Sequence, residues 1–132
     1  MSDVAQAPSP AWEWLGMKLV ASEEGSATVD MTATEDMANH GGFVHGGMIS
    51  TLADSAMGRS VHTLTSAVTR AMSFDLKLNF INAAKIGETL RATGHVIHAG
   101  RRTVVTECRI DGKDGRLVAT ASATFVVTRE KE

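Results

Sequence analysis

The feature that most constrains the fold is a run of apolar residues with helical spacing between Met48 and His62. Small or apolar side chains recur there every three or four positions, at Met48, Ile49, Leu52, Ala53, Ala56, Met57 and Val61. A helix that is apolar nearly all round is normally a buried one. The pattern therefore predicts one long helix enclosed by the rest of the chain, with Asp54 and Arg59 as its only formal charges.

Asp54 needs an explanation, because acidic side chains are seldom buried. The positions three and four residues away hold Ser50, Thr51, Met57 and Gly58. None of them is basic, so no ion pair within the helix accounts for the carboxylate, and its partner is expected from elsewhere in the fold. A structural role is one interpretation, with the carboxylate hydrogen-bonded to backbone or packed at a subunit contact.

The residues before the helix favour a functional role for this carboxylate. His45-Gly46-Gly47 leads into the helix, and glycines let a substrate approach the backbone closely. The first N–H groups of a helix have no partners within it, so they suit a developing oxyanion. A carboxylate combined with such donors is the minimal set for acyl-group hydrolysis, in which a base or nucleophile attacks a carbonyl that amides polarise.

Beyond the helix the pattern changes to the period of two that is typical of strands. Apolar residues alternate with polar ones at Met72, Phe74, Leu76, Leu78 and Phe80, which predicts a half-buried strand. Further strands are predicted at Met17–Ala21, Ser26–Thr32, Thr89–Ile97, Thr103–Ile110 and Leu117–Thr128. Short turns join most of them, so neighbours run antiparallel. The fold class is therefore α+β, with an antiparallel sheet of five to six strands wrapped around one long central helix.

Length and composition limit the range of functions. A chain of 132 residues makes one domain, which we expect over residues 12–128, between a loose tail at 1–11 and a charged tail at 129–132. The net charge of -2 gives no electrostatic reason to bind nucleic acid. No run reaches the ~20 apolar residues of a membrane span, and the first residues lack the pattern of a signal peptide. We therefore expect a cytoplasmic protein without a membrane or nucleic-acid partner.

Other catalytic chemistries find little support in the sequence. His40, His62, His95 and His98 lack the spacing of metal ligands, so we expect no metal site. No serine lies in a G-x-S-x-G motif, which disfavours a Ser-His-Asp hydrolase. Cys108 is the only cysteine, and we expect it to be a small core residue.

The chain resembles the hotdog-fold acyl-CoA thioesterases of the phenylacetate-pathway and 4-hydroxybenzoyl-CoA type, from about Trp12 to Thr128. The matching motifs are, in order, Asn39, His45-Gly46-Gly47, Leu52-Ala53-Asp54, Ser73-Phe74-Asp75-Leu76 with Asn79-Phe80, Gly100-Arg101-Arg102 and the alanine-rich last strand. The resemblance implies a hotdog fold. It also implies hydrolysis of an aryl- or medium-chain acyl-CoA to free acid and coenzyme A, without a bound cofactor.

The resemblance implies a catalytic role for four residues. The carboxylate of Asp54 is the nucleophile or the general base, and the backbone N–H of Gly46 polarises the thioester carbonyl. Asn39 helps to place the thioester or the attacking water, and Ser73 assists that water. A homo-oligomer is also implied, a dimer or, as we favour, a tetramer built from dimers. In it the loop at residues 39–47 of one subunit faces Asp54 and Ser73 of another.

Five further residues are candidates for substrate binding. His45 and Gly47 belong to the loop before the helix, where His45 is expected to orient the turn. Phe43 either lines an acyl or aryl pocket or simply packs. Arg101 and Arg102 follow Gly100 in a turn, where they either engage the phosphates of coenzyme A or are solvated.

Two other functions remain open from the sequence. A hotdog dehydratase or hydratase would pair a histidine with an acid, and His45 with Asp54 supplies such a pair. A non-catalytic module that binds acyl-CoA is the second alternative. Asp54 together with Asn39 speaks against that module, because binding alone needs no carboxylate near a thioester. Phenylacetyl, hydroxybenzoyl and medium-chain fatty acyl groups are all candidate substrates.

Overall fold

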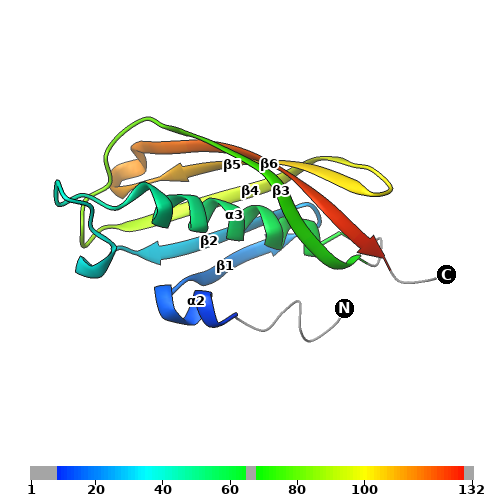
Figure 1. Ribbon diagram of the computed structural model, residues 1–132, viewed down its shortest axis with the longest axis horizontal. Coiled ribbons are helices and arrows are strands. Elements are labelled where there is room, and N and C mark those ends of the chain that lie inside the picture. The colour runs from blue at the N-terminus through cyan, green and yellow to red at the C-terminus, as the bar shows by residue number, and fades with distance from the viewer. Residues whose placement is uncertain (1–8, 65–67, 130–132) are drawn as a thin grey trace.

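A computed structural model describes residues 9–64 and 68–129 of the chain. The elements in chain order are α2 (Pro10–Leu15), β1 (Lys18–Glu23), β2 (Ser26–Thr32), η1 (Glu35–Met37), α3 (Gly46–His62), β3 (Val68–Phe80), β4 (Thr89–Ala99), β5 (Thr103–Asp111), η2 (Lys113–Gly115) and β6 (Leu117–Arg129). The strands form one six-stranded antiparallel sheet in the order β1-β2-β4-β5-β6-β3. This sheet curves around α3 (Figure 1), as the predicted hotdog fold requires, so the predicted fold class is confirmed.

Helix α3 is held against the middle of the sheet by its buried face. That face consists of Ile49, Leu52, Ala53, Ala56, Met57, Ser60 and Val61. It packs on β2 and β4, where Gly94 of β4 allows an unusually close approach. A Cβ atom at Gly94 would lie only 2.9 Å from backbone atoms of Ala56 and Met57. The helix therefore rests on the backbone of the strand with no side chain between them.

The last strands complete the core with small side chains. Ala119, Ala121 and Ala123 of β6 are buried, and Cys108 of β5 is buried beside them. Burial, helped by the charge of Asp111, raises the pKa of the Cys108 thiol to about 12. The prediction that this cysteine is a core residue is confirmed.

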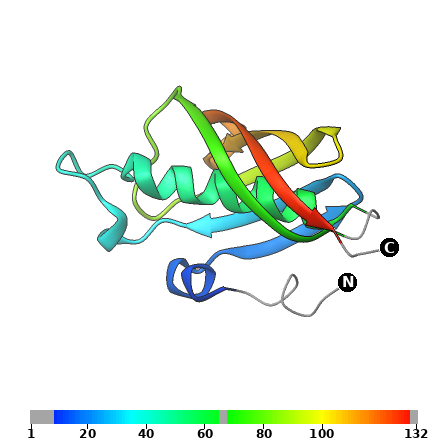
Figure 2. The same cartoon turned by 45° about the vertical axis from the view of Figure 1, so that its right-hand side comes forward.

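Strand β3 forms as predicted but is not half-buried, so that part of the prediction is wrong. It is an edge strand, and 68% of Met72 and 63% of Phe74 are exposed. An irregularity in its pairing with β6 between Ser73 and Asp75 interrupts the alternation. Met72 consequently pairs with Val126, which is exposed. Figure 2 shows β3 (green) running beside β6 (red) at the side of the sheet.

The ends of the predicted domain differ slightly from the structure. Ser9 caps α2 by accepting a hydrogen bond from the N–H of Trp12, so this helix begins inside the segment expected as a tail. Residues 1–8 and 130–132, where most of both tails was expected, lie outside the described residues. Of the helices in the described part of the chain, none is long and apolar enough to cross a membrane.

Candidate active site

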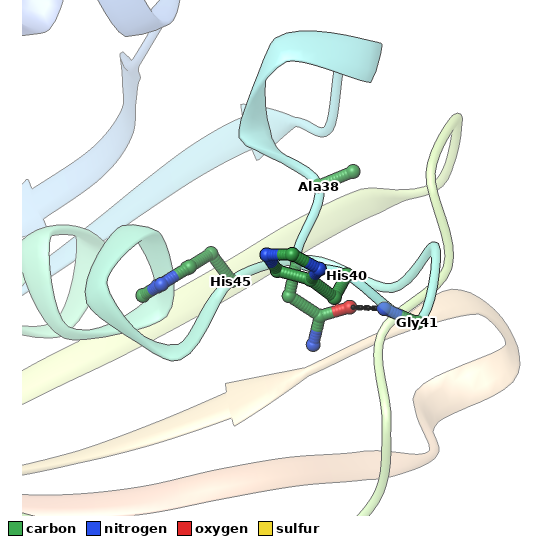
Figure 3. A pocket seen from close by; sticks show the side chains of 5 residues that line it. Ala38, His40, Gly41 and His45 are labelled. Atoms are coloured by element: carbon green, nitrogen blue, oxygen red, sulfur yellow. Dashed lines mark hydrogen bonds between the residues drawn. The ribbon is translucent and has the colours of Figure 1, made fainter.

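Asn39 shapes the loop that leads into α3. Its Oδ1 accepts hydrogen bonds from the N–H of Gly41 at 2.9 Å and of Phe43 at 3.1 Å (Figure 3 draws the first). Its backbone N–H donates to the carbonyl of Phe43 at 2.7 Å. Because two N–H groups need the oxygen, the amide nitrogen Nδ2 points away from them, and it has no hydrogen-bond partner among the described residues. Asn39 thus offers a free NH₂ group at the loop surface.

His45 fixes the start of α3 and leaves one glycine amide free. Its Nδ1 accepts a hydrogen bond from the N–H of Gly47 at 2.9 Å, and its own N–H donates to the carbonyl of Met37 at 2.7 Å. This cap explains why α3 begins at Gly46, two residues earlier than the sequence pattern predicts. The N–H of Gly46 has no acceptor within residues 9–64 and 68–129. Of the two glycine amides, only that of Gly46 is available to a ligand.

An apolar hollow opens beside this free amide. Its volume is about 290 Å³, and its lining includes Asn39, Phe43, Gly46, Ile49, Phe80 and Ala84. The ring of Phe80 packs against Gly46, since a Cβ atom on Gly46 would come within 3.2 Å of its Cζ atom. A second hollow, of about 550 Å³, lies on the side of the loop formed by Ala38, His40 and His45 (Figure 3). Asn39 lines both hollows and therefore lies between them.

Asp54 is half-buried on α3, and the partner expected for it is not found. Its Oδ1 atom is buried and has no hydrogen-bond partner in the part of the chain that the structure describes. Asp54 lies eight residues after Gly46, which corresponds to ~12 Å along the helix axis. That spacing is longer than the reach of an Asp side chain. Within one chain, the carboxylate and the free amide cannot act on the same carbonyl group.

Ser73, Arg101 and Arg102 lie far from the loop of their own chain. Ser73 comes seven residues before Phe80, the residue that contacts Gly46. Seven residues of strand span ~23 Å. Arg101 and Arg102 occupy the exposed turn between β4 and β5 (yellow in Figure 1), at the end of the molecule where α3 ends. The predicted site residues thus form two groups at opposite ends of α3, with Asp54 between them.

Two further residues of α3 carry buried polar atoms without partners. The Nε atom of Arg59 and the Nδ1 atom of His62 are buried, and neither has a hydrogen-bond partner among the residues that the structure describes. Burial lowers the pKa of Arg59, and burial together with the charge of Arg59 lowers the pKa of His62. Within residues 9–64 and 68–129, no cluster of three or more His, Cys, Asp or Glu side chains resembles a metal site. These unpartnered atoms of α3 are exceptions to the rule that buried polar groups are hydrogen-bonded.

The glycine turn and the helix of the candidate site lie within the part of the chain that matches a known family. The model of the Thioesterase superfamily matches residues 41–119, which include the glycine turn, α3 and most of the sheet. The chain belongs to the thioesterase superfamily. This superfamily member is 34% identical to the acyl-coenzyme A thioesterase PaaI of Escherichia coli over 106 residues, which cover 80% of this chain and 73% of PaaI. It is 29% identical to the 1,4-dihydroxy-2-naphthoyl-CoA hydrolase of Listeria monocytogenes, over 91% of this chain and 97% of that protein.

Solved structures of other proteins are similar to this superfamily member over most of its chain. The E. coli PaaI structure superposes with a TM-score of 0.89 at 26% identity, covering 96% of this chain and 89% of PaaI. A Streptococcus mutans protein bound to acetyl CoA has a TM-score of 0.78 at 29% identity, covering 88% of this chain and 91% of that protein. The resemblance to hotdog thioesterases inferred from the sequence motifs is therefore confirmed.

Proposed function

We propose that this protein hydrolyses acyl-CoA thioesters to a free acid and coenzyme A. The observation that carries the proposal is the unpartnered, buried carboxylate oxygen of Asp54 in a chain whose glycine turn presents one free amide. The relatives add support, because PaaI is an acyl-coenzyme A thioesterase and the S. mutans protein was solved with acetyl CoA. Binding alone would not require an ionisable group that lacks a partner.

The chemistry follows from the donors and the carboxylate. The N–H of Gly46 donates to the thioester oxygen and stabilises the negative charge that develops there. As a general base, Asp54 takes a proton from water while the water oxygen bonds to the carbonyl carbon. The C–S bond then breaks, and coenzyme A leaves as a thiolate that acquires a proton. As a nucleophile, Asp54 would form a mixed anhydride that water hydrolyses. Asn39 Nδ2 and the Ser73 hydroxyl orient the thioester and the water.

We further propose that each active site lies between two subunits. The ~12 Å between Gly46 and Asp54 along α3 supports this, because a second chain must bring a carboxylate to the amide. The exposed edge of β3 supports it as well, since unpaired apolar edges invite pairing with another strand. If two β3 strands pair antiparallel about a point between Leu76 and Lys77, the partner's Ser73 comes opposite Phe80, next to Gly46. A dimer, or a tetramer of two such dimers, satisfies this arrangement.

Mixing two inactive variants tests the shared site. Gly46→Pro removes the amide donor and Asp54→Asn removes the carboxylate, so a heterodimer of the two has one intact site and one doubly altered site. Random exchange of subunits in a dimer then restores about a quarter of the wild-type activity. Thiol release, measured after refolding the variants together, gives the value. No recovery in a mixture that mass spectrometry shows to contain heterodimers would assign the whole site to one chain.

Arg101 and Arg102 are proposed to bind the phosphates of coenzyme A from their exposed turn. Replacing both by Ala should raise KM for an acyl-CoA, with little change in the hydrolysis of a short thioester that lacks the nucleotide. The advantage of the wild type should shrink as salt is added, because exposed charges are screened. Steady-state kinetics with both substrates at two salt concentrations measure this. Equal KM values for wild type and double variant on acyl-CoA at low salt would exclude the two arginines from the binding site.

Three functions are separated by one set of measurements on the purified protein. Release of free thiol with turnover across a panel of aryl- and medium-chain acyl-CoAs supports hydrolysis and ranks the acyl groups. Binding of acyl-CoA by calorimetry without thiol release would favour the non-catalytic module. Addition of water to an enoyl-CoA would favour the hydratase, and the loss of the absorbance of the enoyl group measures it. The absence of both binding and turnover for every acyl-CoA would contradict the proposal.

A further inference from the structure

A buried carboxylate lies close to the proposed site but takes no part in the chemistry described above. The side chain of Glu88, between β3 and β4, is only 6% exposed. Its Oε2 accepts hydrogen bonds from the N–H of Lys85 at 2.7 Å and from Arg116 Nη2 at 2.9 Å, and its Oε1 accepts from the N–H of Lys113 at 2.8 Å. Glu88 thus joins the loop before β4 to the turn between β5 and β6.

The contacts keep this carboxylate ionised. Burial by itself raises the pKa of Glu88, but the backbone N–H groups of Lys113 and Lys85 and the side chain of Arg116 lower it. The net pKa lies below its ordinary value. Hydrogen bonds to a charged acceptor are about twice as strong as neutral ones, so this junction is rigid compared with an ordinary surface loop.

Glu88 and Arg116 are connected to the loop before α3 through the backbone of residues 83–85. Arg116 Nη2 also donates to the carbonyl of Ala83 at 3.2 Å, so the segment at residues 83–85 is held from two sides. The carbonyl of Ala84 in this segment accepts the N–H of Val44 at 2.9 Å, and Phe43 forms a β-bridge with Lys85. Val44 is separated from Gly46 by His45 alone. The wall of the hollow beside Gly46 is therefore fastened to Glu88.

We propose that Glu88 is a positioning residue, which fixes the wall at residues 83–85 and through it aims the N–H of Gly46 at the thioester carbonyl. The inference rests on the proposed hydrolysis for its kinetic consequence. An oxyanion donor must be held in place to within a fraction of an ångström to be effective. A loop of the chain does not achieve this without an anchor, and Glu88 supplies one through Ala84 and Val44.

Two variants disturb the anchor in different ways. Glu88→Gln removes the charge and turns an NH₂ group toward one of the N–H donors. Gly112→Ala keeps Glu88 but places a Cβ atom 2.5 Å from its Oε1, which forces the carboxylate to move. The backbone of Gly112, with a φ of -95°, accepts alanine, so this second variant acts by steric displacement. We expect both variants to lower kcat roughly ten- to a hundredfold, with a smaller change in KM.

The matched control is a second carboxylate that is paired with an arginine away from the site. Asp30 of β2 makes two hydrogen bonds with Arg91 of β4, at 2.8 and 2.9 Å. Asp30→Asn therefore also removes an ion pair, and it should leave kcat unchanged. All three variants are assayed at the same interval below their own melting temperatures, so that a general loss of stability does not imitate a loss of positioning.

A second measurement does not depend on activity. Hydrogen exchange, followed by NMR, should accelerate at the amides of Lys85 and Val44 in Glu88→Gln and Gly112→Ala, and not in Asp30→Asn. If these two variants exchange faster but the wild-type protein hydrolyses no thioester, the anchor is supported and the proposed function is refuted. Unchanged protection of Val44 together with unchanged kcat in both variants would overturn the proposal. If Glu88→Gln does not fold, Gly112→Ala alone decides between these outcomes.

Discussion

Replacing Asp54 by Asn is expected to reduce the rate of thioester hydrolysis by ~100-fold or more, because removing a general base has effects of that order. The amide has nearly the same shape as the carboxylate but cannot attack a carbonyl or accept a proton from water. The buried Oδ1 of Asp54 has no partner in the described part of the chain, so a neutral group should be at least as stable there. We therefore expect the melting temperature to stay equal or to rise.

The control variant for this prediction, Asp30→Asn, should show the opposite effects on melting temperature and turnover. Asp30→Asn breaks the contact with Arg91 and should lower the melting temperature while leaving turnover unchanged. Thiol release and thermal unfolding, measured on both variants, distinguish a catalytic carboxylate from a structural one. Turnover by Asp54→Asn at a rate close to that of the wild type would rule out the catalytic assignment. Failure of Asp54→Asn to fold would favour the structural interpretation.

Replacing Gly46 by Pro is expected to have an effect of the same order, a loss in kcat equivalent to ~3 kcal/mol of transition-state stabilisation. Proline removes the N–H that we assign to the thioester oxygen. The change is compatible with the backbone, because Gly46 is the first residue of α3, a position that proline favours. His45 before it is extended, with φ of -63° and ψ of 137°, as a residue preceding proline should be.

Gly46→Ala separates the loss of the donor from the added bulk. Alanine keeps the N–H, and its Cβ lies at the same position against the Phe80 ring, 3.2 Å from Cζ. We expect Ala to lower kcat much less than Pro does. Steady-state kinetics of the two variants, with size-exclusion chromatography to verify assembly, make the comparison. A proline variant that assembles and retains full turnover would refute the role of this amide.

The sequence predicted the helix and the strands well, because their signals are local. The spacing of apolar residues defined α3 to within two residues at its start, and the remaining difference comes from the His45 cap. The exposure of β3 was not predictable in the same way. Alternation in Met72–Phe80 indicates a strand, but neither its place at the edge of the sheet nor the irregularity after Ser73 is written in that pattern. Both depend on which strand pairs with it.

The same distinction applies to the site. Asn39, His45 and Gly46 are close in sequence, and in the structure Asn39 lines one hollow with His45 and another with Gly46. No local sequence pattern indicated the proposed role of Glu88, because its partners Arg116 and Lys113 are 28 and 25 residues away along the chain. The partner expected for Asp54 is not found among the described residues. A sequence motif identifies such a carboxylate but does not say which subunit it serves.

The contact between α3 and Gly94 has a consequence for how this protein can vary. Because the close atoms there belong to the backbone of Ala56 and Met57, no rotamer change relieves an added methyl group, and the whole helix must shift. Gly46 is the first residue of that rigid helix, so a displacement at the middle of the sheet is carried to the free amide. The direction of the proposed donor, the N–H of Gly46, is thus set from the interior of the protein as well as from the loop, because Gly94 fixes how closely α3 approaches the sheet.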